Sequence, residues 1–202
     1  MLNPKQETIS KLNAKYMNYN FRYISHYLGS TTSELTKSFK TNSFMEVPRL
    51  VKVVLTVGLG KAISERIKIE KLAESLANIS GQKPVVTKAS KAIANFKIKQ
   101  GDAVGLKVTI RNERMFDFLN KLVNISLPRL RDFRGIPTKS FDSFGNLNIG
   151  ILDQMVFPEF NYSEGNVDSG MNICIVTNTK SQERAKHLLT LFNFPFKDTE
   201  HG

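Results

Sequence analysis

The chain has 202 residues, a length that suits one sizeable domain or two small ones. Hydrophobic residues make up 41% of it and charged residues 23%, a balance that excludes a largely disordered protein. Lys and Arg number 29 against 18 Asp and Glu, so the net charge is +11. A protein this basic usually meets a polyanion, either nucleic acid or an anionic membrane surface.

Several kinds of site are excluded by what the sequence lacks. A single cysteine, Cys174, excludes an internal disulfide framework and a cysteine-based zinc site. The three histidines, His26, His187 and His201, show no metal-ligand spacing, so we expect no metal and no cofactor. No apolar run reaches the ~18 residues that a membrane span needs, so we expect no membrane partner. Residues 1–10 lack the pattern of a secretory signal or a cleavable transit peptide.

The positive charge is clustered rather than evenly spread. Residues 83–114 carry a net charge of +6 and residues 129–139 carry +3, whereas residues 140–182 carry −4. On a surface that is adapted only for solubility, positively and negatively charged side chains are interspersed. The clustering therefore predicts a defined electrostatic footprint, with residues 140–182 facing elsewhere.

The first predicted elements follow from hydrophobic periodicity. A helix is expected over residues 8–28, a polar stretch with scattered aromatic side chains. Residues 49–58 alternate and are rich in β-branched side chains, which predicts a strand. Residues 62–79 predict an amphipathic helix, with Gly81 as its C-cap and Pro84 as its stop. The apolar face of this helix is expected to hold Ile63, Ile67, Leu72, Leu76 and Ile79.

The second half of the chain continues with short strands and two more helices. Strands are expected at residues 84–87, 103–111, 147–152, 155–158 and 170–179. A helix over 112–127 is expected to be broken by Pro128, and another over 181–194 has Ser181 as its N-cap candidate. Because strands outnumber helices and βαβ units do not repeat cleanly, the pattern favours a single α+β domain with a mostly antiparallel sheet packed against helices.

The sequence gives little support to the hypothesis that the protein is an enzyme. Gly58, Gly60 and Lys61 follow a strand and open a helix, which permits a nucleotide-dependent enzyme as an alternative. However, Ala62 stands where a phosphate-binding loop has Ser or Thr, so a tight strand-to-helix turn explains these residues better. Cys174 alternates with isoleucines in a predicted strand and is expected to be a small apolar filler. No catalytic constellation is found.

Residues 88–101 form a basic excursion between two predicted strands. The lysines can each neutralise a phosphate, and small residues between them permit close backbone approach. The aromatic ring can stack on a base or tuck under the loop, and a solvated basic hairpin without a partner is the competing interpretation. The residues concerned are Lys88, Lys91, Phe96, Lys97 and Lys99.

A second basic cluster is formed by Arg129, Arg131 and Arg134 in a stretch rich in Gly and Pro. Guanidinium groups at this spacing suit bidentate contacts with phosphate. Asp132 can instead pair with one of them and hold the loop.

Five blocks of the sequence resemble, in order and spacing, the bacterial-type large-subunit ribosomal protein five family. The blocks are residues 80–115, 127–142, 150–160, 170–179 and 192–196. The resemblance runs from about Phe44 to Phe196. We therefore expect a ribosomal RNA-binding α+β domain over 44–202, preceded by an N-terminal helical extension over 1–43.

The resemblance implies a structural role without enzymatic activity. The family binds 5S rRNA in the central protuberance, and the corresponding positions here are Thr56, Gln82, Thr109 and Arg111. Its loop, residues 87–100 here, reaches toward peptidyl-site tRNA. It also contacts a protein of the small-subunit head, and the arginines at 129, 131 and 134 are candidates for that intersubunit bridge or for a large-subunit rRNA contact. Neighbouring ribosomal proteins are the other implied partners.

Some positions depart from the family pattern. Thr56 stands where Asn is usual, Asn112 replaces a common Gly, and Ser143-Phe144 replaces a Gly-Arg pair. These departures are accompanied by extra residues at the N-terminus and by an amino-acid composition typical of an AT-rich genome. Together they indicate a mitochondrial ribosomal protein of the matrix. Bacterial cytoplasm and plastid stroma are the alternative locations. Some organellar ribosomes lack 5S rRNA, so binding to large-subunit rRNA and proteins alone stays open.

Overall fold

The computed structural model describes residues 46–60, 66–131, 133–160 and 169–197, together with residues 35, 38 and 39. The chain divides into two compact units, Met1–Pro48 and Arg49–Gly202, and the sheet and the helices around it belong to the second. The helix expected over 8–28 lies outside the described residues. The division into residues 1–43 and 44–202 stays a prediction.

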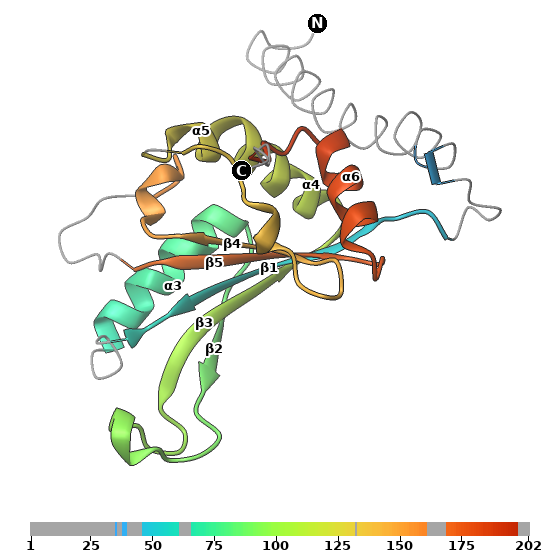
Figure 1. Ribbon diagram of the computed structural model, residues 1–202. Helices are drawn as coiled ribbons and strands as arrows, with labels where there is room; N and C mark the ends of the chain where they lie inside the picture. The colour runs from blue at the N-terminus through green and yellow to red at the C-terminus, as the bar shows by residue number, and fades with distance from the viewer. Residues whose placement is uncertain are drawn as a thin grey trace, which may run out of the picture. The chain divides into compact units, whose positions relative to one another are not determined.

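A five-stranded antiparallel sheet forms the centre of the second unit (Figure 1). Its strands lie in the order β2-β3-β1-β5-β4. They are β1 (Leu50–Gly58), β2 (Val85–Lys88), β3 (Ala103–Ile110), β4 (Leu147–Ile151) and β5 (Met171–Thr177). All four neighbouring pairs are antiparallel, which confirms the expected α+β class.

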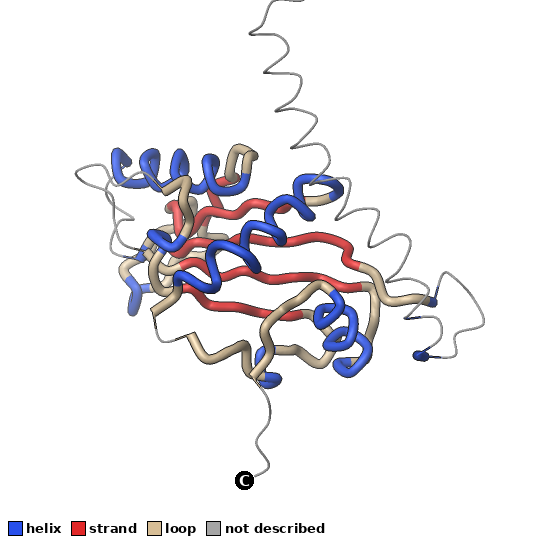
Figure 2. Tube along the Cα trace, turned by 90° about the horizontal axis from the view of Figure 1, so that it is seen from above, coloured by secondary structure: helices blue, strands red, loops and turns tan. Residues whose placement is uncertain are grey.

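The two faces of the sheet differ because side chains alternate along each strand. In β1, Val53, Leu55 and Val57 are buried, whereas Val54 and Thr56 between them are half-exposed. The helices gather on one side of the sheet, as the two views in Figures 1 and 2 show. The core thus lies between the apolar sheet face and the helices, and the described residues place no helix on the opposite sheet face.

Helix α3 (Arg66–Ser80) ends as the sequence predicts. Gly81 takes the left-handed conformation (φ +66°), and its N–H donates to the carbonyl of Ala77 at 2.8 Å. The expected apolar face is only partly correct. Leu72, Leu76 and Ile79 are buried, but Ile67 is 71% exposed because it lies in the first turn of α3, which the core does not cover. Ile63 lies outside the described residues.

The helix predicted over 112–127 is longer than expected. It starts as α4 (Asn112–Lys121), continues through a π-helical turn, η5 (Leu122–Ser126), and ends as α5 (Leu127–Arg129). The prediction that Pro128 breaks the helix is wrong, because this proline sits in the first turn of α5, where its missing N–H costs little.

One predicted strand is not formed. Residues 155–158 belong instead to a short 3₁₀ helix, η7 (Gln154–Val156), and the turn after it. The carboxylate of Asp153 accepts a hydrogen bond from the N–H of Met155 at 2.8 Å and so caps this helix. The apolar pattern of this stretch reflects burial of Phe157, which stacks against Phe118 of α4 with ring centroids 6.0 Å apart.

The last helix, α6 (Gln182–Leu191), has the N-cap that the sequence predicts. The hydroxyl of Ser181 accepts from the N–H of Arg184 at 3.5 Å. Two further 3₁₀ turns, η4 (Ala94–Phe96) and η6 (Thr138–Ser140), shape the connections between elements. Within the described part of the chain, no helix combines the length and apolar character that a bilayer crossing demands.

Candidate nucleic-acid interface

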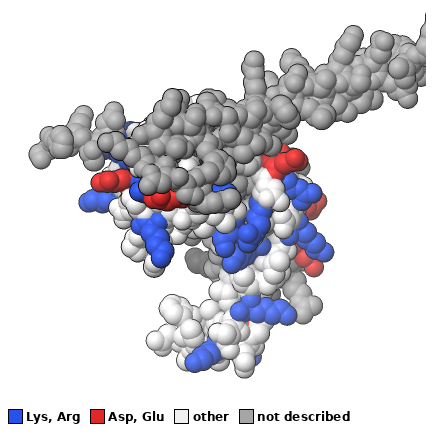
Figure 3. All heavy atoms as spheres, turned by 90° about the vertical axis from the view of Figure 1, so that its right-hand side faces the viewer, with Lys and Arg blue, Asp and Glu red and all other residues white. Residues whose placement is uncertain are grey.

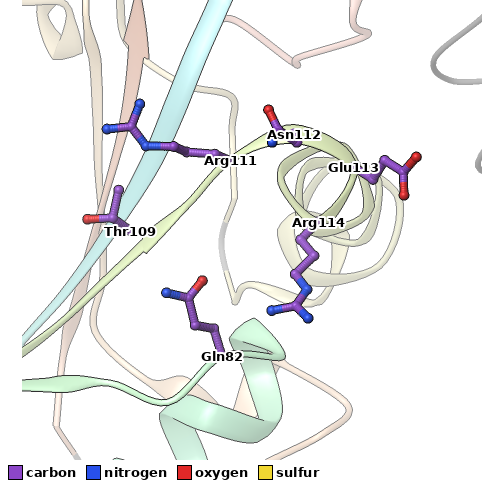
Figure 4. Close-up of a pocket in the computed structure, with 6 residues that line it drawn as sticks. All are labelled: Gln82, Thr109, Arg111, Asn112, Glu113 and Arg114. Carbon is purple, nitrogen blue, oxygen red and sulfur yellow. The ribbon is translucent and has the colours of Figure 1, made fainter.

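An open hollow of about 860 Å³ lies where the end of α3, the end of β3 and the start of α4 meet (Figure 4). It is lined by Gln82, Thr109, Arg111, Asn112, Glu113 and Arg114. Figure 4 shows the side chains of Gln82 and Arg114 reaching into the space between α3 and α4. Three of the four residues that the family resemblance implies for RNA binding are therefore gathered at one place.

The turn from β3 into α4 positions the charged side chains of this hollow. Arg111 is still extended (φ −139°, ψ 169°), and Asn112 takes the left-handed conformation with φ +55°. Asn is one of the few residues other than Gly that adopt this conformation without large strain. Asn112 therefore suits this position, and the sharp turn places Arg111 and Arg114 on the same hollow.

Gln82 is held by the end of α3. The buried hydroxyl of Ser80 donates to the carbonyl of Leu76 at 2.7 Å and accepts from the N–H of Gln82 at 3.3 Å. The backbone at Gln82 is therefore anchored, while its side chain is exposed. An exposed amide on an anchored backbone offers both a hydrogen-bond donor and an acceptor.

The electrostatics of the hollow are mixed. Arg111 and Arg114 supply two positive charges, and Glu113 supplies a negative one. One turn further along α4, partial burial and then the nearby Glu113 carboxylate raise the pKa of Asp117, against the opposing effect of Lys121. Arg114 was not among the site residues predicted from the sequence. It lies in the first turn of α4, three residues after the extended Arg111.

Thr56 does not line the hollow, but it lies on the same uncovered face of the sheet as Thr109. In the register of the sheet, Thr109 of β3 is opposite Val54, and Thr56 is two residues further along β1, opposite Lys107. Residues two apart on a strand point to the same side. Lys107 is exposed on this face and was not predicted as part of the site.

Cys174 lies on this face as well. It pairs with Val54 across β1 and β5 and is half-exposed, so the prediction of an apolar filler is wrong. The reason is the alternation of β5, which turns its neighbours Ile173 and Ile175 toward the core instead. Burial, followed by the charge of Asp142, raises the pKa of the Cys174 thiol, and Lys52 acts in the opposite direction.

The basic excursion forms a finger, residues 88–101, that extends away from the sheet between β2 and β3 (Figure 1). Ile93 and Ile98 exchange backbone hydrogen bonds of 2.9 and 3.2 Å, which close the tip. Phe96 is 71% exposed at the tip, so it does not tuck under the loop. The lysines at 88, 91, 97 and 99 are all exposed, and Figure 3 shows basic side chains on the finger and on the body above it.

The arginine cluster lies elsewhere. Arg129, Arg131 and Arg134 are exposed and do not line the hollow. The backbone after them is held to the C-terminal segment, because Ile136 donates to the carbonyl of Pro195 at 2.8 Å and accepts from Lys197 at 3.0 Å. Asp132, the alternative partner of these arginines, lies outside the described residues.

In the described ranges, no three or more His, Cys, Asp or Glu side chains gather where they could hold a metal ion. Gly60 takes the left-handed conformation (φ +46°) and the N–H of Leu59 donates to the carbonyl of Val104 at 3.0 Å. This anchors the end of β1 at the expected turn, while Lys61 lies outside the described residues.

These features define a class: an α+β protein whose sheet carries helices on one face and polar and basic side chains on the other. Comparison with known proteins specifies the family. The family described as Ribosomal protein L5 matches residues 43–99, and the C-terminus of the same ribosomal family matches residues 103–196. The chain belongs to the ribosomal protein L5 family.

Individual relatives agree with this assignment. The chain is 49% identical over 170 residues to the large ribosomal subunit protein uL5 of Streptococcus pneumoniae strain Hungary19A-6, and this match covers 84% of the chain and 94% of the relative. The protein of the same name from strain CGSP14 matches with the same identity and coverage. Membership in a family of ribosomal proteins confirms the expectation that the chain is not an enzyme, and the nucleotide-dependent alternative at Gly58 to Lys61 is wrong.

Proposed function

We propose that this ribosomal protein is a structural constituent of the large subunit that binds 5S rRNA in the central protuberance. The observation that carries the proposal is the hollow shared by Gln82, Thr109 and Arg111, which brings together residues from the end of α3 and the end of β3. Family membership and the relatives named as large-subunit proteins support the location.

The chemistry of these groups suits RNA that is recognised by shape. A duplex RNA presents phosphates, 2′-hydroxyls and base edges across its shallow minor groove. The Arg111 guanidinium can grip phosphate with two donors, and the Gln82 amide can both donate and accept. Thr56 and Thr109 present compact hydroxyls from rigid strands, which fixes the direction of each contact.

A filter-binding titration with a bacterial 5S rRNA transcript tests this assignment. Arg111→Ala and Gln82→Ala are each expected to weaken binding by about 1–3 kcal/mol, because each leaves a polar RNA group without its partner. Lys180→Ala and Gln100→Ala are the controls, since both side chains are exposed and neither lines the hollow. Unchanged affinity for both hollow variants would refute the assigned face.

The finger is proposed to contact peptidyl-site tRNA. Its support is the exposed set of lysines around Phe96, on a hairpin whose tip is closed by backbone hydrogen bonds. Arg129, Arg131 and Arg134 are proposed to contact the small-subunit head or large-subunit rRNA, and their exposure beside a backbone anchored at Ile136 supports a fixed presentation.

The proposed mitochondrial location and the proposed 5S rRNA partner both depend on the organism and compartment from which the chain comes. Mitochondrial location is proposed from the composition and the N-terminal surplus, while the relatives named above are bacterial. In a ribosome without 5S rRNA, the same face would bind large-subunit rRNA and neighbouring ribosomal proteins. Purification of the native particle, with identification of its RNAs and of the cross-linked neighbours of this chain, decides both points.

A further inference from the structure

The end of α3 borders two open spaces. Gln82, just after the helix, lines the hollow. Ile79, Ser80 and Gly81 line a second cavity of about 180 Å³, whose other wall is formed by residues of α4. Gly81 and Gln82 are exposed, and a Cβ placed on Gly81 would have no atom within 4 Å. Because little is packed against this turn, its position depends strongly on hydrogen bonds.

Ser80 supplies the hydrogen bonds that reach Gln82. Its Oγ lies 2.7 Å from the carbonyl oxygen of Leu76, 2.9 Å from that of Gln82 and 3.3 Å from the Gln82 nitrogen. The hydroxyl donates to one carbonyl at a time and accepts from the Gln82 N–H. Both main-chain polar groups of Gln82 thus lie within reach of one buried hydroxyl, which ties this residue back to the last turn of α3.

A second buried serine provides a comparison. Ser126 of η5 is buried as Ser80 is, but among the described residues its Oγ has no hydrogen-bond partner. A buried hydroxyl without a partner is unfavourable, since it has lost its hydrogen bonds to water. The two serines therefore carry the same buried group, and of these two only the Ser80 hydroxyl holds the chain next to the hollow.

We propose that Ser80 is a positioning residue for RNA recognition, which holds Gly81 and Gln82 so that the Gln82 amide stays within reach of the RNA. The inference rests on the proposed function, and Ser80 acts through Gln82 because it does not itself line the hollow. A folded RNA presents its groups at fixed spacings, so Gln82 and Arg111 bind it together only if the end of α3 keeps its place. A segment that is ordered before binding loses less conformational entropy in the complex.

Filter binding with the bacterial 5S rRNA transcript tests this role. Ser80→Ala removes the hydroxyl and is expected to weaken binding about three- to tenfold, the effect of losing one hydrogen bond. Ser80→Thr keeps the hydroxyl, and the cavity beside it leaves room for the extra methyl group, so this variant is expected to bind like the wild type. Ser126→Ala is the matched control and is expected to leave the affinity unchanged, because its hydroxyl holds no neighbouring group.

Combination with Gln82→Ala separates positioning from a general loss of structure. If Ser80 acts through Gln82, Ser80→Ala has no further effect on affinity in a chain that already carries Gln82→Ala. In a chain that carries Arg111→Ala, the same substitution still weakens binding by about the factor seen in the wild type. Thermal melting identifies the temperatures at which every variant is folded, and binding is measured there.

The outcomes separate this inference from the proposal on which it rests. If Gln82→Ala weakens binding while Ser80→Ala binds like the wild type, the positioning role is wrong and the RNA-binding role stands. An equal loss from Ser80→Ala with and without Gln82→Ala would also overturn the positioning role. If Gln82→Ala and Arg111→Ala both bind like the wild type, the assigned RNA-binding face is wrong, and the role of Ser80 is wrong with it.

Hydrogen exchange on the unmodified protein tests the same hold without any substitution. The Gln82 N–H donates to Ser80 Oγ, so in the RNA-free protein it is expected to exchange with D₂O at least about tenfold more slowly than in an unstructured peptide of the same sequence. Exchange at the rate of the unstructured peptide would mean that the turn is not held before RNA binds, and the inference would be wrong.

Discussion

Lys121 of α4 donates a hydrogen bond from Nζ to the main-chain carbonyl of Ile79 at 3.0 Å, near the end of α3. The same ammonium donates to the carboxylate of Glu159 at 2.7 Å. A positive charge near the C-terminus of a helix is favourable because the last carbonyls lack partners within the helix. This contact ties α3 to α4. Gln82, two residues after the end of α3, and Arg114 of α4 both line the hollow.

Replacement of Lys121 is expected to destabilise the protein. In Lys121→Met the aliphatic part of the side chain is largely kept, but the Ile79 carbonyl and the Glu159 carboxylate lose their donor. We expect a loss of about 1–3 kcal/mol in the free energy of unfolding, measured by urea denaturation. Lys139→Met, at an exposed position, is the control. Equal stability of the two variants would show that the contact does not hold the helices together.

Gly135 is expected to tolerate no side chain. Its φ is +96°, and a Cβ there would lie 2.8 Å from the main-chain nitrogen of Lys197. Gly101 has a similar φ of +91° but nothing within 4 Å of its Cβ position. Gly101→Ala should therefore cost about 1–2 kcal/mol from backbone strain alone. Gly135→Ala should cost more, because the clash also breaks the pairing of the C-terminal segment with Ile136.

Thermal and urea unfolding of the two alanine variants measure this difference. If Gly135→Ala is no less stable than Gly101→Ala, the C-terminal segment does not pack against Gly135 in solution.

Acid is expected to loosen the turn between η6 and β4. Burial acts to raise the pKa of Asp142, but hydrogen bonds from the Asn146 side chain and from the N–H groups of Asn146 and Phe144 together lower it. A carboxyl whose pKa is lower in the folded state contributes stability above its ordinary pKa of about 3.9, and this is lost as the pH falls through the lowered value. The turn presents the exposed ring of Phe144.

The melting temperature of wild type and Asp142→Asn, followed from pH 7 to pH 2.5, reports this contribution. The wild type should melt higher above pH 4, and the difference should disappear at the acidic end. A difference that is constant across the whole range would exclude the Asp142 charge as its cause.

The finger is expected to act separately from the sheet face. Lys97→Ala combined with Lys99→Ala should leave the affinity for 5S rRNA unchanged, because neither residue lines the hollow. If each lysine neutralises one phosphate, the variant should bind tRNA at the peptidyl site of reconstituted ribosomes more weakly, with a shallower salt dependence. Loss of 5S rRNA binding instead would mean that the two roles are wrongly allocated.

Local patterns in the sequence determined most of the elements. The alternation in residues 49–58 predicted β1, and the spacing of Leu72, Leu76 and Ile79 predicted α3. These predictions hold because each depends on neighbours within a few residues. Local patterns also misled at Pro128 and at residues 155–158, since a helix can accept a proline in its first turn and an apolar stretch can be buried without being a strand.

Which residues share a surface was decided only by the tertiary structure. No residue near Asn172 in the chain indicates that it pairs with Thr56 in the sheet. The sequence predicted Cys174 as an apolar filler, but the register of β5 places it on the uncovered face of the sheet. Strand register is set by packing of a whole buried face against helices from other parts of the chain, and a shift of one residue would exchange the two faces. The sequence alone therefore identified the strands and the charges, and the fold determined which side chains meet on the open face.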